Sequence, residues 1–189
     1  MITTEKKYLS PEEYLKIERD ALTKSEYYKG EMFAMSGSSV NHNIISGNIF
    51  ADLHRQLNNS DFIVFTGDVK ICVSENGFFT YPDVSVISSN IIYYDESKDV
   101  VMNPVVIFEV LSKSTHRYDR GGKFMLYREI DSLEEYILVS QNEIKIEHYT
   151  RQNGSDWHRT EINNIEEEIV LRSIRCIIKV SDVNLKVNF

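Results

Sequence analysis

An apolar run that a single carboxylate interrupts stands out in the chain: Pro104-Val105-Val106-Ile107-Phe108-Glu109-Val110-Leu111. Both alternating faces of this run are apolar, which predicts a central strand covered on its two sides. Glu109 shares a face with Val105, Ile107 and Leu111 by the same alternation. An unpartnered carboxylate in such a strand is costly or takes up a proton. We therefore expect Glu109 to face a cation, a donor cluster or a water-filled cleft, the plain alternative being a buried pair with an arginine or lysine.

A second carboxylate, Asp83, follows Tyr81-Pro82 near the start of the strand that returns after the Asn76-Gly77 turn. Asn-Gly is a strong signal for a two-residue hairpin. An aspartate beside a proline is also common in ordinary turns. If the strand of Asp83 neighbours that of Glu109, the two carboxylates repel each other unless a divalent cation lies between them. Oxygen ligands of this kind suit Mg²⁺ or Mn²⁺.

A basic residue, Lys123, lies in the segment that follows Glu109. A helix is expected from about Asp119 to Ile130, and Lys123 lies on its apolar stripe, which Leu126, Tyr127 and Ile130 form. The lysine stem could extend outward to solvent. Directed inward, its ammonium group would point at the sheet that carries the carboxylates. There it could stabilise charge on a phosphate or orient an attacking water.

The remaining patterns predict an α/β fold with a central mixed sheet, helices on both faces and an antiparallel hairpin leading into the site. Ser10 to Glu13 has the form of a capping box that opens a helix. Lys29-Gly30 separates two short extended runs, which predicts a hairpin. Apolar residues at helical spacing predict a second helix over about 41–57. Strands are expected at 62–66, 69–73, 78–87, 136–139, 144–148, 157–162, 169–171 and 176–180. We expect one domain over residues 1–189.

Composition narrows the classes of protein. The 21 basic against 29 acidic residues give a net charge of −8, which disfavours coating of nucleic acid through bulk charge. No apolar run is long enough to span a membrane, and no secretory signal is visible. Cys72 and Cys176 have no metal-like spacing, so we expect reduced thiols in a cytoplasmic protein. The acidic loop from Asp95 to Asp99 is expected to be a solvated surface.

Several ordered motifs together resemble the Uma family of restriction endonucleases, within the PD-(D/E)XK nuclease superfamily. The resemblance covers roughly residues 8 to 150, leaving the C-terminal strands as an extension. The motifs are Glu26 to Glu31 with Met35, His42, Pro82-Asp83, Glu109 to Thr115, Asp119 to Ile130 and Glu135 to Val139. The resemblance implies a restriction-endonuclease-like fold and allows a homodimer.

The resemblance also implies roles for particular residues. The superfamily lysine usually lies two residues after the second carboxylate, where this chain has Leu111. The family pattern implies that the lysine has moved to Lys123, with Lys113 as the competitor. Glu26 is implied as a further catalytic-site carboxylate beside the cleft, holding a second metal or an active-site water, although in a hairpin it could equally be solvated. His42 is expected only to cap or pack its helix, and no catalytic role is assigned to it.

The resulting hypothesis is Mg²⁺-dependent (or Mn²⁺-dependent) hydrolysis of DNA phosphodiesters. Asp83, Glu109 and the backbone carbonyl of Val110 would coordinate the metal, with Lys123 beside it. A second hypothesis is a non-catalytic module that keeps the nuclease fold to bind nucleic acid or a partner protein. A third is a metal-free structural protein in which Glu109 and Lys123 form a buried ion pair. Fold alone does not discriminate among them.

Overall fold

A six-stranded sheet is built around the apolar run of the sequence. In the computed structural model, which describes residues 8–73, 77–111 and 118–189, this sheet has the strand order β11-β10-β9-β8-β6-β3. Strand β8 (Pro104–Leu111) runs parallel to β9 (Glu135–Ser140) and antiparallel to β6 (Val84–Ser88). The outer strands are β3 (Phe62–Thr66), β10 (Ile146–Arg151) and β11 (Trp157–Ile162). The predicted central strand in a mixed sheet is confirmed.

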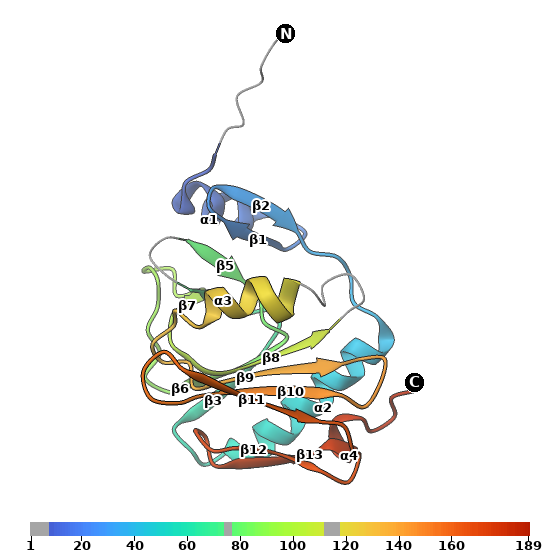
Figure 1. The fold of residues 1–189 in the computed structure, drawn as a ribbon. Helices are drawn as coiled ribbons and strands as arrows, with labels where there is room; N and C mark the ends of the chain where they lie inside the picture. The colour runs from blue at the N-terminus through green and yellow to red at the C-terminus, as the bar shows by residue number, and fades with distance from the viewer. Residues whose placement is uncertain (1–7, 74–76, 112–117) are drawn as a thin grey trace.

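A five-stranded sheet covers one face of the six-stranded sheet (Figure 1). Its order is β2 (Glu31–Ala34), β1 (Ser25–Tyr28), β5 (Phe78–Thr80), β4 (Lys70–Cys72) and β7 (Val100–Val101). The β1–β2 turn has left-handed backbone at Lys29 and Gly30, with φ of 48° and 91°, as the predicted hairpin requires. Asn76 lies outside the described residues, but the antiparallel pairing of β4 with β5 confirms the hairpin that it was expected to close.

The strand expected over 78–87 is wrong as a single element. The structure divides it into β5, in the five-stranded sheet, and β6, in the six-stranded sheet. Pro82 has no N–H to give to a strand ladder, so pairing stops there and the chain passes from one sheet to the other. Asp83 therefore precedes β6 at the crossing point, and it does not lie in the strand that pairs back on β4.

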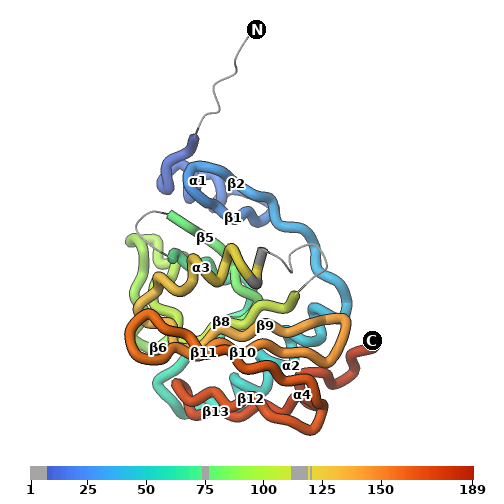
Figure 2. The backbone as a smooth tube through the Cα atoms, in the orientation of Figure 1, coloured from blue at the N-terminus to red at the C-terminus, as the bar shows by residue number. Residues whose placement is uncertain are grey.

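Helices lie on both faces of the six-stranded sheet (Figures 1 and 2). Ser10 and Glu13 form the predicted capping box of α1 (Pro11–Asp20). Helix α2 (Val40–Leu57) confirms the second prediction. The helix expected from Asp119 to Ile130 is shorter and irregular: a π-helical segment, η1 (Tyr118–Lys123), precedes α3 (Phe124–Tyr127). The adjacent glycines 121 and 122 disfavour a regular α-helix, and short π segments are frequent at functional sites.

The two faces of β8 pack into different hydrophobic clusters. Phe108 and Val110 face α2 and the C-terminal elements β12 (Glu168–Leu171), β13 (Cys176–Lys179) and α4 (Val180–Val183). Ile107 and Leu111 face α3 and the five-stranded sheet. Val105 was expected beside Ile107 but packs on the α2 side, because the β6–β8 register shifts between Val86 and Ile87.

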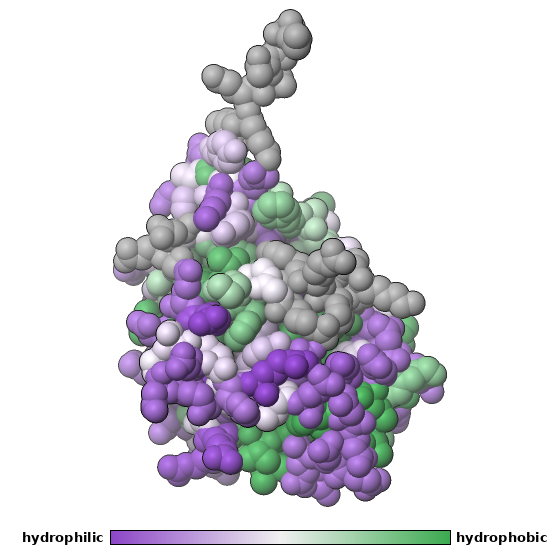
Figure 3. Space-filling model, viewed as in Figure 1, coloured by the Kyte–Doolittle hydropathy of each residue, from purple (hydrophilic) through white to green (hydrophobic). Residues whose placement is uncertain are grey.

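Two surface features are edge strand β11 and the acidic loop of Asp95 and Asp99. Edge strand β11 exposes His158 through Glu161, and the surface over this ribbon is largely hydrophilic in Figure 3, which protects a sheet edge from pairing with another chain. The loop of Asp95 and Asp99 is not simply solvated, as had been expected. Arg19 Nη2 lies 2.7 Å from a carboxylate oxygen of each aspartate, which fixes the loop to α1.

The structure also bears on the expectations for the two cysteines and for membrane-spanning segments. Cys72 and Cys176 are both buried, and neither forms a disulfide within the described part of the chain. Among the described residues, no helix is both long and apolar enough to cross a membrane.

Glu135 fastens the β12–β13 ribbon to the six-stranded sheet. Its carboxylate accepts hydrogen bonds from the Ser173 amide and hydroxyl at 2.9 and 2.6 Å and lies 2.6 Å from His148 Nε2. Burial alone would raise the pKa of Glu135, but the bonds from His148 and Ser173 outweigh it and lower the pKa. A lowered folded-state pKa stabilises the fold above the unfolded-state pKa and loses that contribution as pH falls through the folded-state value.

Glu135→Gln should therefore lower the free energy of unfolding at pH 7 by about 1–3 kcal/mol, the usual cost of breaking a buried hydrogen-bonded group. The deficit should narrow as the pH falls below about 4, because the unfolded carboxyl is protonated there first and the folded one only at lower pH, where the contribution of the charge is lost. Urea titrations across this pH range, with the exposed Glu168→Gln as control, measure it. A deficit that does not change with pH would contradict the assignment.

Candidate active site

Asp83 meets the carboxyl end of β8, as expected for two carboxylates on neighbouring strands. Val84 pairs with Phe108 in the antiparallel β6–β8 ladder, so the preceding Asp83 lies next to Glu109 along the register. The Val110 amide donates to Asp83 Oδ2 at 2.7 Å, and His42 Nε2 lies 2.8 Å from Asp83 Oδ1. The Asp83 side chain keeps 20% exposure, so it is held in place but still reaches solvent.

Lys123 points inward, and the outward, solvent-directed alternative is wrong. Its Nζ lies 2.9 Å from Glu26 Oε1 and 3.2 Å from Glu109 Oε1. Asp119 Oδ1 is 3.4 Å away, one helical turn before the lysine. The Lys123 side chain is only 7% exposed. The structure therefore brings Glu26, Asp83, Glu109 and Lys123 together from four different parts of the chain.

The carboxylates of Glu26 and Glu109 are also held by neutral donors. The Tyr127 hydroxyl donates to Glu109 Oε1 at 2.9 Å. The Thr80 hydroxyl donates to Glu26 Oε1 at 2.5 Å, because β5 pairs with β1 and brings the two side chains together. Glu26 is buried in the cleft, so its solvated alternative is wrong. Tyr127, which the sequence places on the apolar stripe of its helix, contacts the second carboxylate directly.

Glu26, Asp83, Glu109 and Lys123 line a cavity of about 350 Å³. Its wall includes Val110 and the loop of Met35 to Ser39. His42 and Asp119 are in the cavity although the sequence predicted no role for either. A signal for Asp119 exists in its spacing of four residues before Lys123, which places both on one helix face. His42 needed tertiary information, because the sequence assigned it to helix capping, whereas its ring contacts Asp83 from another element.

The charges in this cavity do not balance. Four carboxylates line it, whereas the described part of its wall has one ammonium group, that of Lys123. Burial raises the pKa of Glu109 well above its ordinary value, and the nearby Lys123 offsets only part of that effect. Burial alone would lower the pKa of Lys123, but the surrounding carboxylates, led by Glu109, raise it well above its ordinary value. The arrangement keeps the Lys123 ammonium protonated, and the excess of carboxylates favours the binding of a cation in the cavity.

The donor chemistry of the cavity fits a hard divalent cation, since carboxylate oxygens are the ligands that Mg²⁺ and Mn²⁺ prefer. Asp83 and Glu109 are the candidate ligands, because they are adjacent and line the open cavity. Within residues 8–73, 77–111 and 118–189, no three His, Cys, Asp or Glu side chains are already arranged around one point as a ligand set. A third ligand would have to be a backbone oxygen or water. Lys113 lies outside the described residues.

Comparison with known proteins agrees with this fold. The chain is 35% identical over 169 residues to the uncharacterized protein sll1609 of Synechocystis sp., covering 89% of this chain and 96% of that protein. It is 38% identical over 149 residues to slr1290 of the same organism, covering 79% and 77%. The crystal structure of a "putative nuclease belonging to DUF820" from Anabaena variabilis superposes with a TM-score of 0.76, covering 93% of this chain and 97% of that chain. At 15% identity this likeness shows a shared fold.

The predicted α/β, restriction-endonuclease-like fold class is confirmed, and the family match extends beyond residue 150, so it includes β11, β12 and most of β13. Over residues 11–178 the chain matches the model of a family described as "Putative restriction endonuclease", and it belongs to that family, Uma2.

Proposed function

We propose that this protein hydrolyses DNA phosphodiester bonds with Mg²⁺ or Mn²⁺ as cofactor. The observation that carries the proposal is the meeting of Asp83 and Glu109 from neighbouring strands beside the buried ammonium of Lys123, in an open cavity. Membership of a family described as restriction endonucleases supports the reaction class. The excess of carboxylates in the cavity supports the metal, because a divalent cation would relieve their mutual repulsion.

The side chains that would hold the metal are already oriented. Val110 N–H and His42 fix the two oxygens of Asp83, and Tyr127 fixes one oxygen of Glu109. The carbonyl of Val110, between Glu109 and the end of β8, is the proposed third oxygen ligand. A divalent cation bound there supplies Lewis-acid polarisation of the phosphodiester and lowers the pKa of an attacking water.

Lys123 contributes a fixed positive charge. Because its pKa is raised, the ammonium keeps its proton at neutral pH and is unsuited to accept one as a general base. It would instead position the attacking water or offset charge in the transition state. Glu26 and Asp119 hold the ammonium at 2.9 and 3.4 Å, so we assign them as positioning residues for Lys123.

A metal-free, non-catalytic protein is the second candidate. The observation that favours it is the set of three carboxylates within 3.4 Å of the Lys123 ammonium, which can form a structural ion cluster without any metal. The two functions differ in their response to metal. A nuclease needs Mg²⁺ or Mn²⁺ to cut DNA, whereas a module held by an ion cluster does not cut at any metal concentration.

Asp83→Asn and Glu109→Gln should each reduce Mg²⁺-dependent cleavage of plasmid DNA by at least about 100-fold, as expected when an electrostatic contact in the transition state is lost. Chelation with EDTA should abolish cleavage by the unmodified protein. The matched control is Glu147→Gln, since Glu147 is equally buried and accepts bonds from Tyr149 and Arg159 outside the cavity. Cleavage retained by both site variants would exclude the proposed ligands.

Lys123→Met should lower kcat for cleavage by about 100-fold, because the fixed charge is lost. It should also increase the rise in Tm that MgCl₂ produces, since the cation then relieves the repulsion among the remaining carboxylates. Differential scanning fluorimetry with a MgCl₂ titration measures the second effect. Lys145→Met, which removes a lysine paired with Glu161 outside the cavity, is the control. An unchanged kcat would show that Lys123 has no part in the reaction.

His42→Ala should weaken Mn²⁺ affinity by about 10-fold, the usual effect of removing a partner that orients a metal ligand. Isothermal titration calorimetry measures this directly. His42→Gln keeps a group that can bond to Asp83 and should recover part of the affinity. His54→Ala, at an exposed histidine on the same helix, is the control. Equal affinities for all three variants and the unmodified protein would show that His42 does not orient Asp83 for metal binding.

A further inference from the structure

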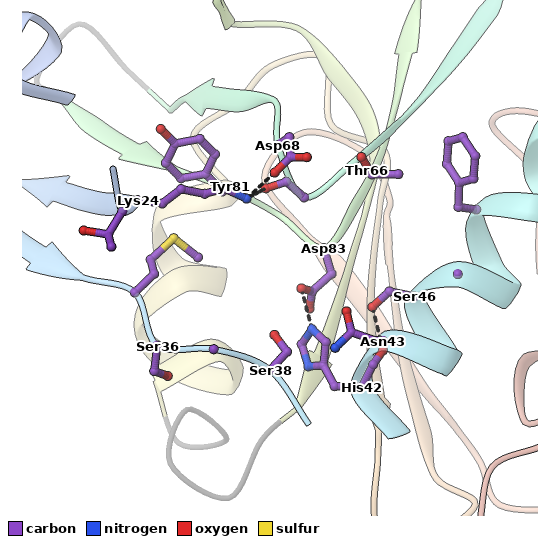
Figure 4. A pocket seen from close by; sticks show the side chains of 16 residues that line it. Lys24, Ser36, Ser38, His42, Asn43, Ser46, Thr66, Asp68, Tyr81 and Asp83 are labelled. Atoms are coloured by element: carbon purple, nitrogen blue, oxygen red, sulfur yellow. Dashed lines mark hydrogen bonds and ion pairs between the residues drawn. The ribbon is translucent and has the colours of Figure 1, made fainter. Parts of the chain in front are cut away.

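A second cavity, of about 550 Å³, adjoins the proposed active site (Figure 4). Asp83, His42 and Tyr81 line both cavities, so the two adjoin at the proposed metal ligand. In Figure 4, Asn43 and Ser46 of α2 lie beside His42, and Lys24 and Tyr81 lie across the cavity from them. The volume is in the range of about 300–1,000 Å³ that small-molecule sites occupy. The metal-site hypothesis makes no use of this larger cavity.

Helix α2 presents two different faces. Ile45, Ile49, Leu53 and Leu57 repeat every fourth residue and are buried against the sheet. Asn43, Ser46, Gly47 and Phe50 follow each other at the spacing of a second helix face, and all four line the large cavity. This second face is polar or small at its start and aromatic at its end.

Gly47 lies in the interior of α2, where glycine is less favourable than alanine. A Cβ atom at this position would meet nothing within 4 Å, so close packing does not require glycine here. Its φ is not in the left-handed region either. The effect of the glycine is to leave the cavity open on the side of α2.

The wall chemistry suits an uncharged, hydrogen-bonding ring next to a phosphate. Asn43, Ser46 and Thr66 supply neutral polar groups, and Phe50 and Met35 supply apolar surface. Asn43 Nδ2 donates to the Ser39 carbonyl and the Ser46 hydroxyl to the His42 carbonyl, so their oxygens are the acceptors for a ligand. Lys24 also lines this cavity, and its side chain is 42% exposed. Its Nζ donates to the Gly67 carbonyl at 2.8 Å and forms an ion pair with Asp68. A nucleobase has the matching features, namely an apolar face for stacking and polar edges for hydrogen bonds.

We propose that the larger cavity binds one unpaired nucleotide of the DNA strand, next to the phosphate that is cut. The inference rests on the proposed function and adds a substrate class to it: single-stranded DNA, or a duplex in which the nucleotide beside the cut is unpaired or extruded. The base contacts Phe50, and its edge bonds to Asn43 and Ser46. The Lys24 ammonium exchanges its contact with the exposed Asp68 for the next phosphate. A base held in a duplex cannot enter such a cavity without leaving its stack.

Gly47→Phe tests this proposal by filling the cavity. Affinities for a short fluorescein-labelled single strand and for the matching duplex are measured by anisotropy in Mg²⁺, in a Glu109→Gln background that prevents cutting. Gly47→Phe should weaken single-strand binding by about 10-fold, the size of one lost base-stacking contact, with little effect on the duplex. Ala51→Phe adds the same ring on the exposed surface of α2, outside the cavity, and should have little effect on either.

A single-strand affinity unchanged by Gly47→Phe, with the variant folded by circular dichroism, would overturn the inference. If this variant does not fold, Asn43→Ala decides, with about 5-fold weaker binding expected from one lost hydrogen bond. Cleavage tests the proposed function separately. A protein that cuts DNA but shows no effect of these variants refutes only the nucleotide cavity; a protein that loses single-strand affinity as expected but never cuts refutes only the nuclease.

Discussion

The ammonium group of Lys123 lies buried among carboxylates from three elements, and the geometry of the site depends on this contact. Glu26 comes from the five-stranded sheet, Glu109 from the six-stranded sheet, and Asp119 from η1, which also carries the lysine. Like-charged carboxylates this close repel one another unless a cation lies among them. Lys123 therefore joins the two sheets at the site as well as placing a positive charge there.

The crossing of the chain between the two sheets has an equally direct consequence. Pro82 ends the pairing of β5, and Asp83 then enters the six-stranded sheet beside the end of β8. The same crossing brings Asp83 under the start of α2, where His42 reaches it. Asp83 thus lines both the cavity of the proposed metal site and the larger cavity. A nuclease that binds an unpaired nucleotide would need this adjacency, because the base and the reacting phosphate belong to one strand.

Residues with a strong local signal were predictable. Glu109 stands out because a charge interrupts a buried strand, and Lys123 because a charge lies on an apolar helical stripe. The segment from Asp119 to Ile130 was predicted as one regular α-helix, but it begins with a π-helical segment. Apolar periodicity does not reveal how two adjacent glycines change the helical geometry. Three contacts were not predicted: His42 with Asp83, Asp119 with Lys123, and Arg19 with Asp95 and Asp99. The first and third join residues from different elements, and the second depends on the irregular backbone of η1.

Periodicity and motif order alone were sufficient for the α/β class, the buried central strand and the capped first helix. These properties depend on interactions between residues close in sequence, or on which side chains tolerate burial. The tertiary structure decided that 78–87 divides between two sheets, that Glu26 is buried against Lys123, and that Gly47 faces a cavity. These depend on how separate elements pack, and the free energy of that packing comes from contacts between residues far apart in the chain.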